Sequence, residues 1–110
     1  MNIIKDSVDD STILAVDWRL HTANYPQLES YLADLLKEGA TQIILDLDKL
    51  EYISSSGLRV ILKTLKQLDE RGGKLLLCGL NDHIMEIFKV SGFTELFQIT
   101  PTREEALKKI

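Results

Sequence analysis

The chain has 110 residues, of which 45% are hydrophobic and 27% charged, and its formal net charge is −4. This length and composition predict one soluble globular domain, residues 1–110, with a single core. No cluster of Lys and Arg stands out that could follow a phosphate backbone, so the sequence argues against direct nucleic-acid binding.

The single cysteine and the lack of long apolar segments narrow the class of protein further. One cysteine, Cys78, excludes an intramolecular disulfide and a cysteine-rich metal site, and its surrounding run "KLLLCGL" indicates a buried thiol. No apolar stretch approaches the roughly 20 residues that a membrane-spanning helix needs. We therefore expect a monomeric cytoplasmic protein without membrane contact, bound metal or cofactor.

Two short apolar stretches near the N-terminus predict a β-hairpin. They are "NII" (2–4) and "STILAVDW" (11–18), and the polar segment 6–10 separates them. The alternation of apolar and polar residues does not fix the register of this hairpin. Trp18, at its end, is interpreted as a residue of the core or its rim.

A helix is predicted next. Apolar residues follow helical spacing at Leu28, Leu32, Leu35 and Leu36. Asn24 or Thr22 can cap the start of this helix, and Pro26 suits its first turn. Gly39 ends it.

The centre of the chain predicts a strand, a helix and a second strand. "QIILDL" (42–47) is a nearly continuous apolar run, which is typical of a strand covered on both faces. The helix spans about 55–71, and "KLLLC" (74–78) is the second buried strand. The expected inward stripe of the helix is Leu58, Ile61, Leu62, Leu65 and Leu68. Such a βαβ unit pairs its strands in parallel, with a right-handed crossover.

The C-terminal third predicts two more helices around a short strand. The first helix covers roughly 81–91, the strand is "LFQI" (96–99), and Thr102 with Glu105 forms a capping box for the last helix. The complete order is β-β-α-β-α-β-α-β-α. It predicts an α/β fold: a mixed β-sheet with a parallel centre, packed helices and an antiparallel edge.

The segment "ISSSG" (53–57) is the most informative local motif. Its serines open a predicted helix just beyond a buried strand, and in open α/β sheets the carboxyl ends of strands are where sites are built. Free N–H groups and the helix dipole make such a position favourable for an anion, so a phosphoryl group on Ser55 or Ser56 would be tolerated. One serine suffices as an N-cap, and a purely structural role for the motif therefore stays open at this point.

Catalytic interpretations of the same residues are weaker. A serine nucleophile needs a base, and the only histidines are His21, in a loop that could approach the serines, and His83, in the first turn of a predicted surface helix. The glycine that begins a G-x-S-x-G elbow is missing. Asp46 and Asp48 have no glycine-rich phosphate loop beside them, and Asp46 is interpreted as positioning its loop. We therefore expect no enzyme.

The segment "LDLDKLEYISSSGLRVILKTLKQLDERGGKLLLCGL" closely resembles the centre of bacterial single-domain STAS proteins, the anti-sigma factor antagonists. The similarity extends to "WRLHTANYPQLESYL" before it and "IMEIFKVSGFTELFQITPTREEAL" after it, and so covers essentially the whole chain. The predicted element order is also that of the STAS fold.

The resemblance implies a protein switch. In this family the unphosphorylated antagonist binds an anti-sigma factor, a serine kinase with the histidine-kinase-like ATPase fold. Phosphorylation of one serine ends that complex, and a PP2C-type phosphatase restores the serine. Carried over to this chain, Ser55 is the phosphorylation site. The implied partner-binding residues are His21, Thr22, Ser54, Ser55, Ser56, Gly57 and Leu58.

This chain departs from the family pattern at two positions. The family motif Asp-Ser-Ser/Thr/Ala-Gly has an acid where this chain has Ser54, and a second family acid is His21 here. Fewer negative charges beside Ser55 would lower the repulsion that a new phosphate meets. The alternative function is an unphosphorylated STAS scaffold or sensor module that acts through protein contacts.

Overall fold

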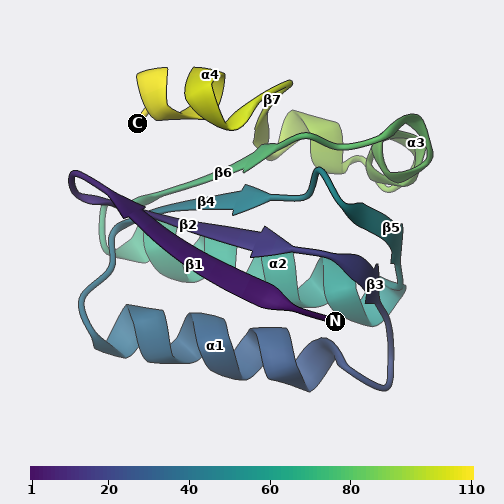
Figure 1. Ribbon diagram of the computed structural model, residues 1–110, viewed down its shortest axis with the longest axis horizontal. Coiled ribbons are helices and arrows are strands. Elements are labelled where there is room, and N and C mark those ends of the chain that lie inside the picture. Colours follow the sequence, from purple (N-terminus) through teal and green to yellow (C-terminus); the bar gives the residue numbers. More distant parts are fainter.

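The computed structural model describes residues 1–110, in which helices pack against a mixed β-sheet (Figure 1). A five-stranded sheet has the order β1-β2-β4-β6-β7, in which β1 is antiparallel to β2 and all other pairs are parallel. The parallel centre with an antiparallel edge confirms the predicted fold class. The strands of this sheet are β1 (Ile3–Val8), β2 (Ser11–Val16), β4 (Gln42–Asp46), β6 (Lys74–Cys78) and β7 (Gln98–Thr100).

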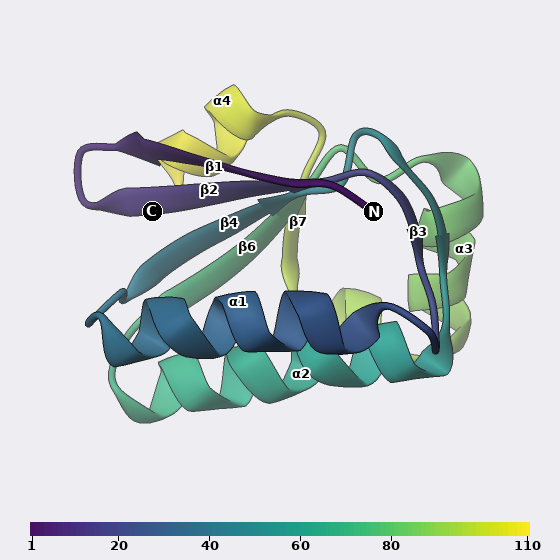
Figure 2. The same ribbon diagram turned by 60° about the horizontal axis from the view of Figure 1, so that its bottom comes forward.

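Helices cover both faces of the sheet. Figure 2 shows α1 (Tyr25–Lys37) and α2 (Ser55–Glu70) side by side along one face, with their N-terminal ends together. The other face carries α4 (Arg103–Lys108), and α3 (Asp82–Val90) lies at the end of the domain. A 3₁₀ turn, η1 (Phe93–Glu95), follows α3. No helix combines the length and the apolar character that crossing a membrane requires.

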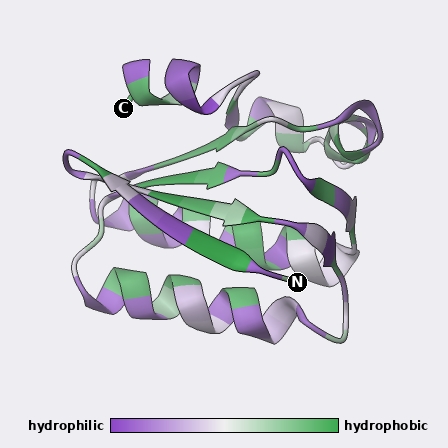
Figure 3. Ribbon diagram, viewed as in Figure 1, coloured by the Kyte–Doolittle hydropathy of each residue, from purple (hydrophilic) through white to green (hydrophobic).

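The two faces of the sheet have cores of different size. The main core, 21 buried residues, lies between the sheet and the two long helices, and five residues form a smaller core beneath α4. Strands β2, β4 and β6 contribute to both, which explains their continuous apolar runs (Figure 3). The smaller core consists of Ile13, Ile44, Leu76, Cys78 and Ala106.

An arginine fastens the short helix α4 to the sheet. Arg103 Nη2 and Nε donate to Asp46 Oδ2 at 2.9 and 3.1 Å, and Nη1 donates to Asp6 Oδ2 at 3.3 Å. Asp46 Oδ1 also accepts from the backbone N–H of Asp48 at 3.1 Å, so this carboxylate does position its loop, as the sequence predicts. Thr102 caps the helix as expected, since its hydroxyl accepts from the N–H of Glu105. The Glu105 carboxylate does not accept from the N–H of Thr102, so the predicted capping box is only half formed.

The structure corrects the sequence prediction at two short strands. The sequence predicts no strand between the strand 42–47 and the helix that begins near residue 55, but β5 (Leu50–Ile53) pairs in parallel with β3 (Trp18–Leu20) in a separate two-stranded sheet. Both strands are too short to show a period in the sequence, and their pairing joins distant segments. Figure 1 shows this pair at the end of the domain that also carries α3.

Three smaller differences concern the bounds of the hairpin turn and the last strand, and the buried face of α2. The turn of the hairpin is only Asp9–Asp10, because β1 includes polar residues that face solvent. In α2, Val60 and Thr64 are buried, whereas Leu62 and Leu65 lie at the margin of the core. The last strand is Gln98–Thr100 instead of 96–99, and it leaves Leu96 exposed.

We predict that Cys78 makes stability fall at alkaline pH. Burial of this thiol, reinforced by the neighbouring Asp46 charge, raises its pKa from 9.0 to about 12. The stabilisation is complete below pH 9.0 and is lost as pH rises towards 12, because the unfolded thiol ionises first. Urea unfolding should show a difference between wild type and Cys78→Ala that is constant below pH 9.0 and shrinks above it. A difference that stays constant across this window would contradict the prediction.

Candidate functional site

Strands β3 and β5 bring two distant parts of the candidate site together. Leu20 pairs with Ile53 at the carboxyl ends of the two parallel strands. The residues that follow them, His21 and Ser54, therefore leave the small sheet at the same end. The backbone N–H of Ser54 donates to the carbonyl oxygen of Leu20 at 2.9 Å, which extends the ladder by one bond. The loop after β3 therefore does reach the serines. It does so through backbone pairing.

Ser54 is the N-cap of α2. Its backbone is extended, and its hydroxyl accepts from the N–H of Gly57 at 3.2 Å. Its carbonyl oxygen accepts from the N–H of Leu58 at 3.0 Å, the first bond of the helix. Ser54 thus has the capping role that a single serine of the motif suffices to fill.

The other two serines occupy different environments in the first turn of α2. Ser55 is exposed, and its hydroxyl makes no hydrogen bond to the rest of the chain. Ser56 is half-buried and borders a shallow groove of about 150 Å³ between α1 and α2. The groove is also lined by Tyr25, Glu29, Arg59, Val60 and Lys63. Of the three hydroxyls, Ser55 is therefore the most accessible to another protein.

Gly57 lets the first turn of α2 pack closely on the small sheet. A Cβ atom at this position would lie 2.7 Å from Cγ of Leu20 and 3.0 Å from Cγ1 of Ile53. Both of these side chains are buried, so neither can move away freely. Gly57 and the buried Leu58 accordingly face the interior, and they support the site from beneath.

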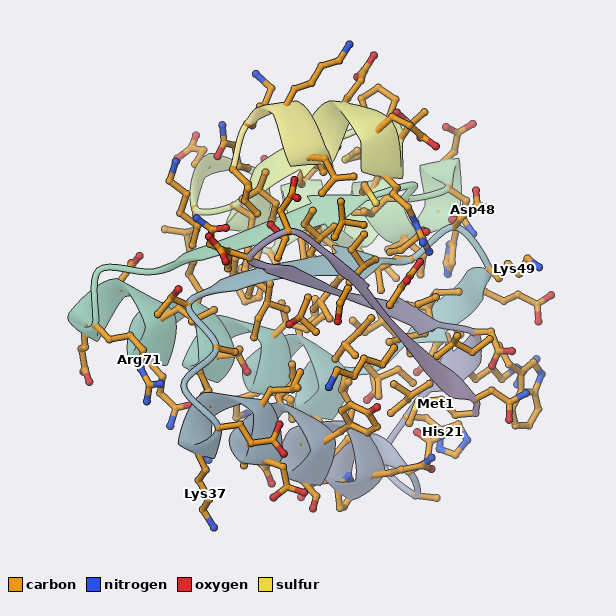
Figure 4. The ribbon with its side chains drawn as sticks, turned by 60° about the vertical axis from the view of Figure 1, so that its left-hand side comes forward. Met1, His21, Lys37, Asp48, Lys49 and Arg71 are labelled. Carbon is orange, nitrogen blue, oxygen red and sulfur yellow. The ribbon has the colours of Figure 1, made fainter.

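His21 and Thr22 form the neighbouring edge of the site. His21 is half-buried, and its Nδ1 accepts from the N–H of Ala23 at 3.1 Å. The centroid of its ring lies 6.3 Å from that of the Trp18 ring, in an edge-to-face arrangement. Thr22 is exposed. Figure 4 places His21 at one end of the molecule, and Lys37 and Arg71 at the opposite end.

The structure corrects the predicted capping of α1. Asn24 occupies the N-cap position, but its side chain makes no capping bond to the helix. Its Oδ1 accepts from the N–H of His21 at 2.9 Å, and its Nδ2 donates to the carbonyl oxygen of Arg19 at 2.8 Å. Asn24 thus orders the loop that carries His21 next to the serines. Thr22 does not cap the helix either.

The structure corrects the interpretation of Trp18 as a residue of the core or its rim, and it exposes a second aromatic residue of the small sheet, Tyr52, which the sequence did not single out. Trp18 and Tyr52 keep 51% and 41% of their surface accessible. Trp18 adopts a positive φ of 67° at a register shift between the strands, where its N–H donates to the carbonyl oxygen of Lys49 at 2.9 Å. The guanidinium of Arg19 lies 5.9 Å from the centre of the indole ring. Only the pairing of β3 with β5, which the sequence did not reveal, could have indicated this placement.

Neither a metal-binding cluster nor a hydrogen bond between a histidine and a serine is present at the site. No group of three or more His, Cys, Asp or Glu side chains is placed to hold a metal ion. His83 is exposed in the first turn of α3, and no hydrogen bond connects it to the serines. His21 uses Nδ1 for its own loop. The site offers a partly aromatic surface on which the hydroxyl of Ser55 is exposed and free of hydrogen bonds to the chain.

A small α/β domain of this topology, with a serine-capped helix above a short parallel strand pair, defines a known class of protein. Residues 2–106 match the STAS domain, and the chain belongs to the STAS domain family. It is similar to BtrV, a candidate anti-sigma factor antagonist of Bordetella bronchiseptica, with 41% identity over 106 residues, 96% of this chain and 91% of BtrV. The anti-sigma-B factor antagonist of Staphylococcus aureus is 27% identical over 104 residues, 94% of this chain and 96% of that protein.

Solved structures have the same fold over the full length of the domain. A candidate anti-sigma factor antagonist of Thermotoga maritima superimposes with a TM-score of 0.94 at 27% identity, covering 98% of this chain and 93% of that one. The Bacillus cell fate determinant SpoIIAA in its phosphorylated form gives a TM-score of 0.77 at 20% identity, covering 98% of both chains. At that identity the second likeness concerns the fold alone.

We predict that Gly57→Ala destabilises the protein by about 1–3 kcal/mol, because the new methyl group overlaps Leu20 in a packed core. Urea unfolding at equilibrium measures the change. The matched test is the double variant with Leu20→Ala, in which the overlapping atoms are gone. Its destabilisation should be smaller than the sum of the two single effects, and strict additivity would refute the steric explanation.

Ser54 provides an independent test of the cap. Ser54→Ala should lower the free energy of unfolding by about 1 kcal/mol, since the N–H of Gly57 loses its acceptor. Ser54→Asp should retain wild-type stability, because a carboxylate accepts the same bond and favours the helix N-terminus. Equal stability of the Ala and Asp variants would count against a capping role.

Proposed function

We propose that the chain is an anti-sigma factor antagonist whose Ser55 is the switch. The unphosphorylated protein binds an anti-sigma factor that is also a serine kinase of the histidine-kinase-like ATPase fold. That kinase phosphorylates Ser55, the complex dissociates, and a PP2C-type phosphatase restores the serine. The names of BtrV and the Staphylococcus aureus relative support the antagonist role, and the switch is our extension of it to this chain.

The single observation that carries the proposal is the difference between the three serines. Ser54 is engaged as a cap and Ser56 is half-buried in a groove, whereas Ser55 is exposed with an unengaged hydroxyl. A kinase can reach this hydroxyl without unwinding α2. The cap bond from Gly57 to Ser54 does not involve Ser55, so the helix can keep its start after modification.

The surface around Ser55 suits contact with another protein. Trp18, Tyr52 and His21 lie on the small sheet and the loop beside it, and aromatic residues are enriched at the centres of protein interfaces. The rigid base formed by Gly57 and Leu58 means that the surface needs little ordering on binding. These features favour a binding site over a catalytic one.

The proposed switch works through charge. A phosphoserine carries about −1.5 to −2 at neutral pH, and burying that charge at an interface is unfavourable unless a cation of the partner pairs with it. Because Ser55 lies in the contact surface itself, phosphorylation can dissociate the complex without a change in the fold.

A second candidate function is an unphosphorylated STAS scaffold or sensor module. The observation that favours it is the juxtaposition of His21 and Ser54, which brings together the two positions where related proteins carry acids. A kinase that recognises an acidic pair would find none here. A phosphate-affinity gel with ATP and the cognate kinase separates the two functions. A shift that Ser55→Ala abolishes supports the switch, and an unshifted protein that still binds the kinase supports the scaffold.

We predict that Ser55→Asp weakens binding to the kinase while Ser55→Ala binds it permanently. The carboxylate imitates part of the phosphate charge, and alanine cannot be modified. Affinity is measured by calorimetry in the presence and absence of ATP, with Ser7→Ala, an exposed serine next to the hairpin turn and outside the site, as the matched control that should behave like wild type. Circular dichroism checks that each variant is folded. Equal affinities of the Asp and Ala variants would refute the switch.

A further inference from the structure

Helix α2 carries a cation one helical turn after Ser55. Ser55 and Arg59 are four residues apart, and side chains at this spacing are neighbours on the helix surface. Helical side chains lean towards the N-terminus, so a side chain at position 59 can reach back towards the turn that contains the serines. Arg59 also lines the groove that Ser56 borders, which places it beside the first turn of α2.

Arg59 differs from the other three arginines because it has no partner within the chain. Arg19 lies over the indole ring of Trp18, Arg71 donates to the carbonyl oxygen of Leu36 at 2.7 Å, and Arg103 pairs with two carboxylates. Arg59 is exposed and makes no side-chain hydrogen bond or ion pair. Its neighbour one turn further on, Lys63, is already paired with Glu29 at 3.4 Å. Arg59 is therefore the nearest available cation to Ser55 on its own helix.

We propose that Arg59 is the internal partner of a phosphate on Ser55, an inference that rests on the proposed function of that serine. A guanidinium can donate two parallel hydrogen bonds to phosphate oxygens, and i,i+4 spacing lets it do so without a change in the helix. In the unphosphorylated protein the same guanidinium is free to meet a carboxylate of the anti-sigma factor. Phosphorylation thus adds an anion and removes a cation from one surface.

This pairing makes phosphorylation a larger change in surface charge, because the one modification adds an anion at Ser55 and also neutralises the cation at Arg59. The local charge of residues 55 and 59 goes from +1 to between about −0.5 and −1. A partner surface with a carboxylate opposite Arg59 loses its ion pair and faces a phosphate instead. Such a partner distinguishes the two forms more strongly than one that meets Ser55 alone.

A double-mutant cycle on the full chain tests the pair directly. Phosphoserine is introduced at position 55 during translation, so that no kinase is needed, and Ser55 and phosphoserine forms are compared with Arg59 intact and with Arg59→Gln. We expect Arg59→Gln to lower the folding equilibrium constant of the phosphorylated form about threefold more than that of the unphosphorylated form, at low salt. Lys66→Gln, an exposed cation further along α2, is the matched control and should show no such difference. Identical responses to Arg59→Gln and Lys66→Gln would overturn the inference.

Affinity for the kinase provides the second readout and separates the two levels of the proposal. Arg59→Gln should weaken binding of the unphosphorylated protein, and phosphorylation should then reduce affinity by a smaller factor than in wild type. Wild-type affinity of unphosphorylated Arg59→Gln would overturn the role of Arg59 in docking while leaving the Ser55 switch intact. If phosphoserine at position 55 has no effect on affinity, the proposed function fails, and the stability cycle still reports on the pair.

Discussion

The close contact between Gly57 and the β3–β5 pair is the constraint on which the candidate site depends. Helix α2 begins directly above two buried side chains, with no room for a Cβ atom at its third position. That contact sets how closely the first turn of α2 packs on the small sheet. In this position the backbone of Ser54 is hydrogen-bonded to β3, Ser56 borders the groove between α1 and α2, and Ser55 is exposed to solvent. The absence of a side chain at Gly57 therefore allows the packing that gives the three serines their different environments.

The rest of the fold makes this support rigid. Strands β2, β4 and β6 are covered on both faces, by two long helices on one side and by α4 on the other. Because α4 is short, its packing on the small core is reinforced by the Arg103–Asp46 ion pair. Asp46 in turn holds the N–H of Asp48 at the start of the segment that becomes β5. Residues on the far face of the sheet thus help to place the strand that carries the site.

The sequence predicts most of the main sheet and all four helices, but only part of the site. Apolar runs such as 42–47 and 74–78 are long enough to identify buried strands, and the glycines and caps that bound the helices act locally. The sequence does not reveal strands β3 and β5, because three or four residues cannot show a hydrophobic period. These strands are stabilised by pairing with each other. For the same reason the sequence indicates the serines, which are local, but not the exposure of Trp18 and Tyr52. Asn24 shows a further limit, since its side chain orders the His21 loop instead of capping its helix.

A site built in this way favours regulation by surface charge over regulation by shape. The elements beneath Ser55 are buried, hydrogen-bonded and tightly packed, so a modification of its hydroxyl meets a support that resists displacement. The groups above them are exposed and include the hydroxyl of Ser55, the unpaired guanidinium of Arg59 and the rings of Trp18 and Tyr52. Electrostatic interactions among these groups are strong only when a partner excludes water from them. We therefore expect the proposed phosphate on Ser55 to affect the isolated domain little and to disfavour a complex, which is the property that a reversible binding switch requires.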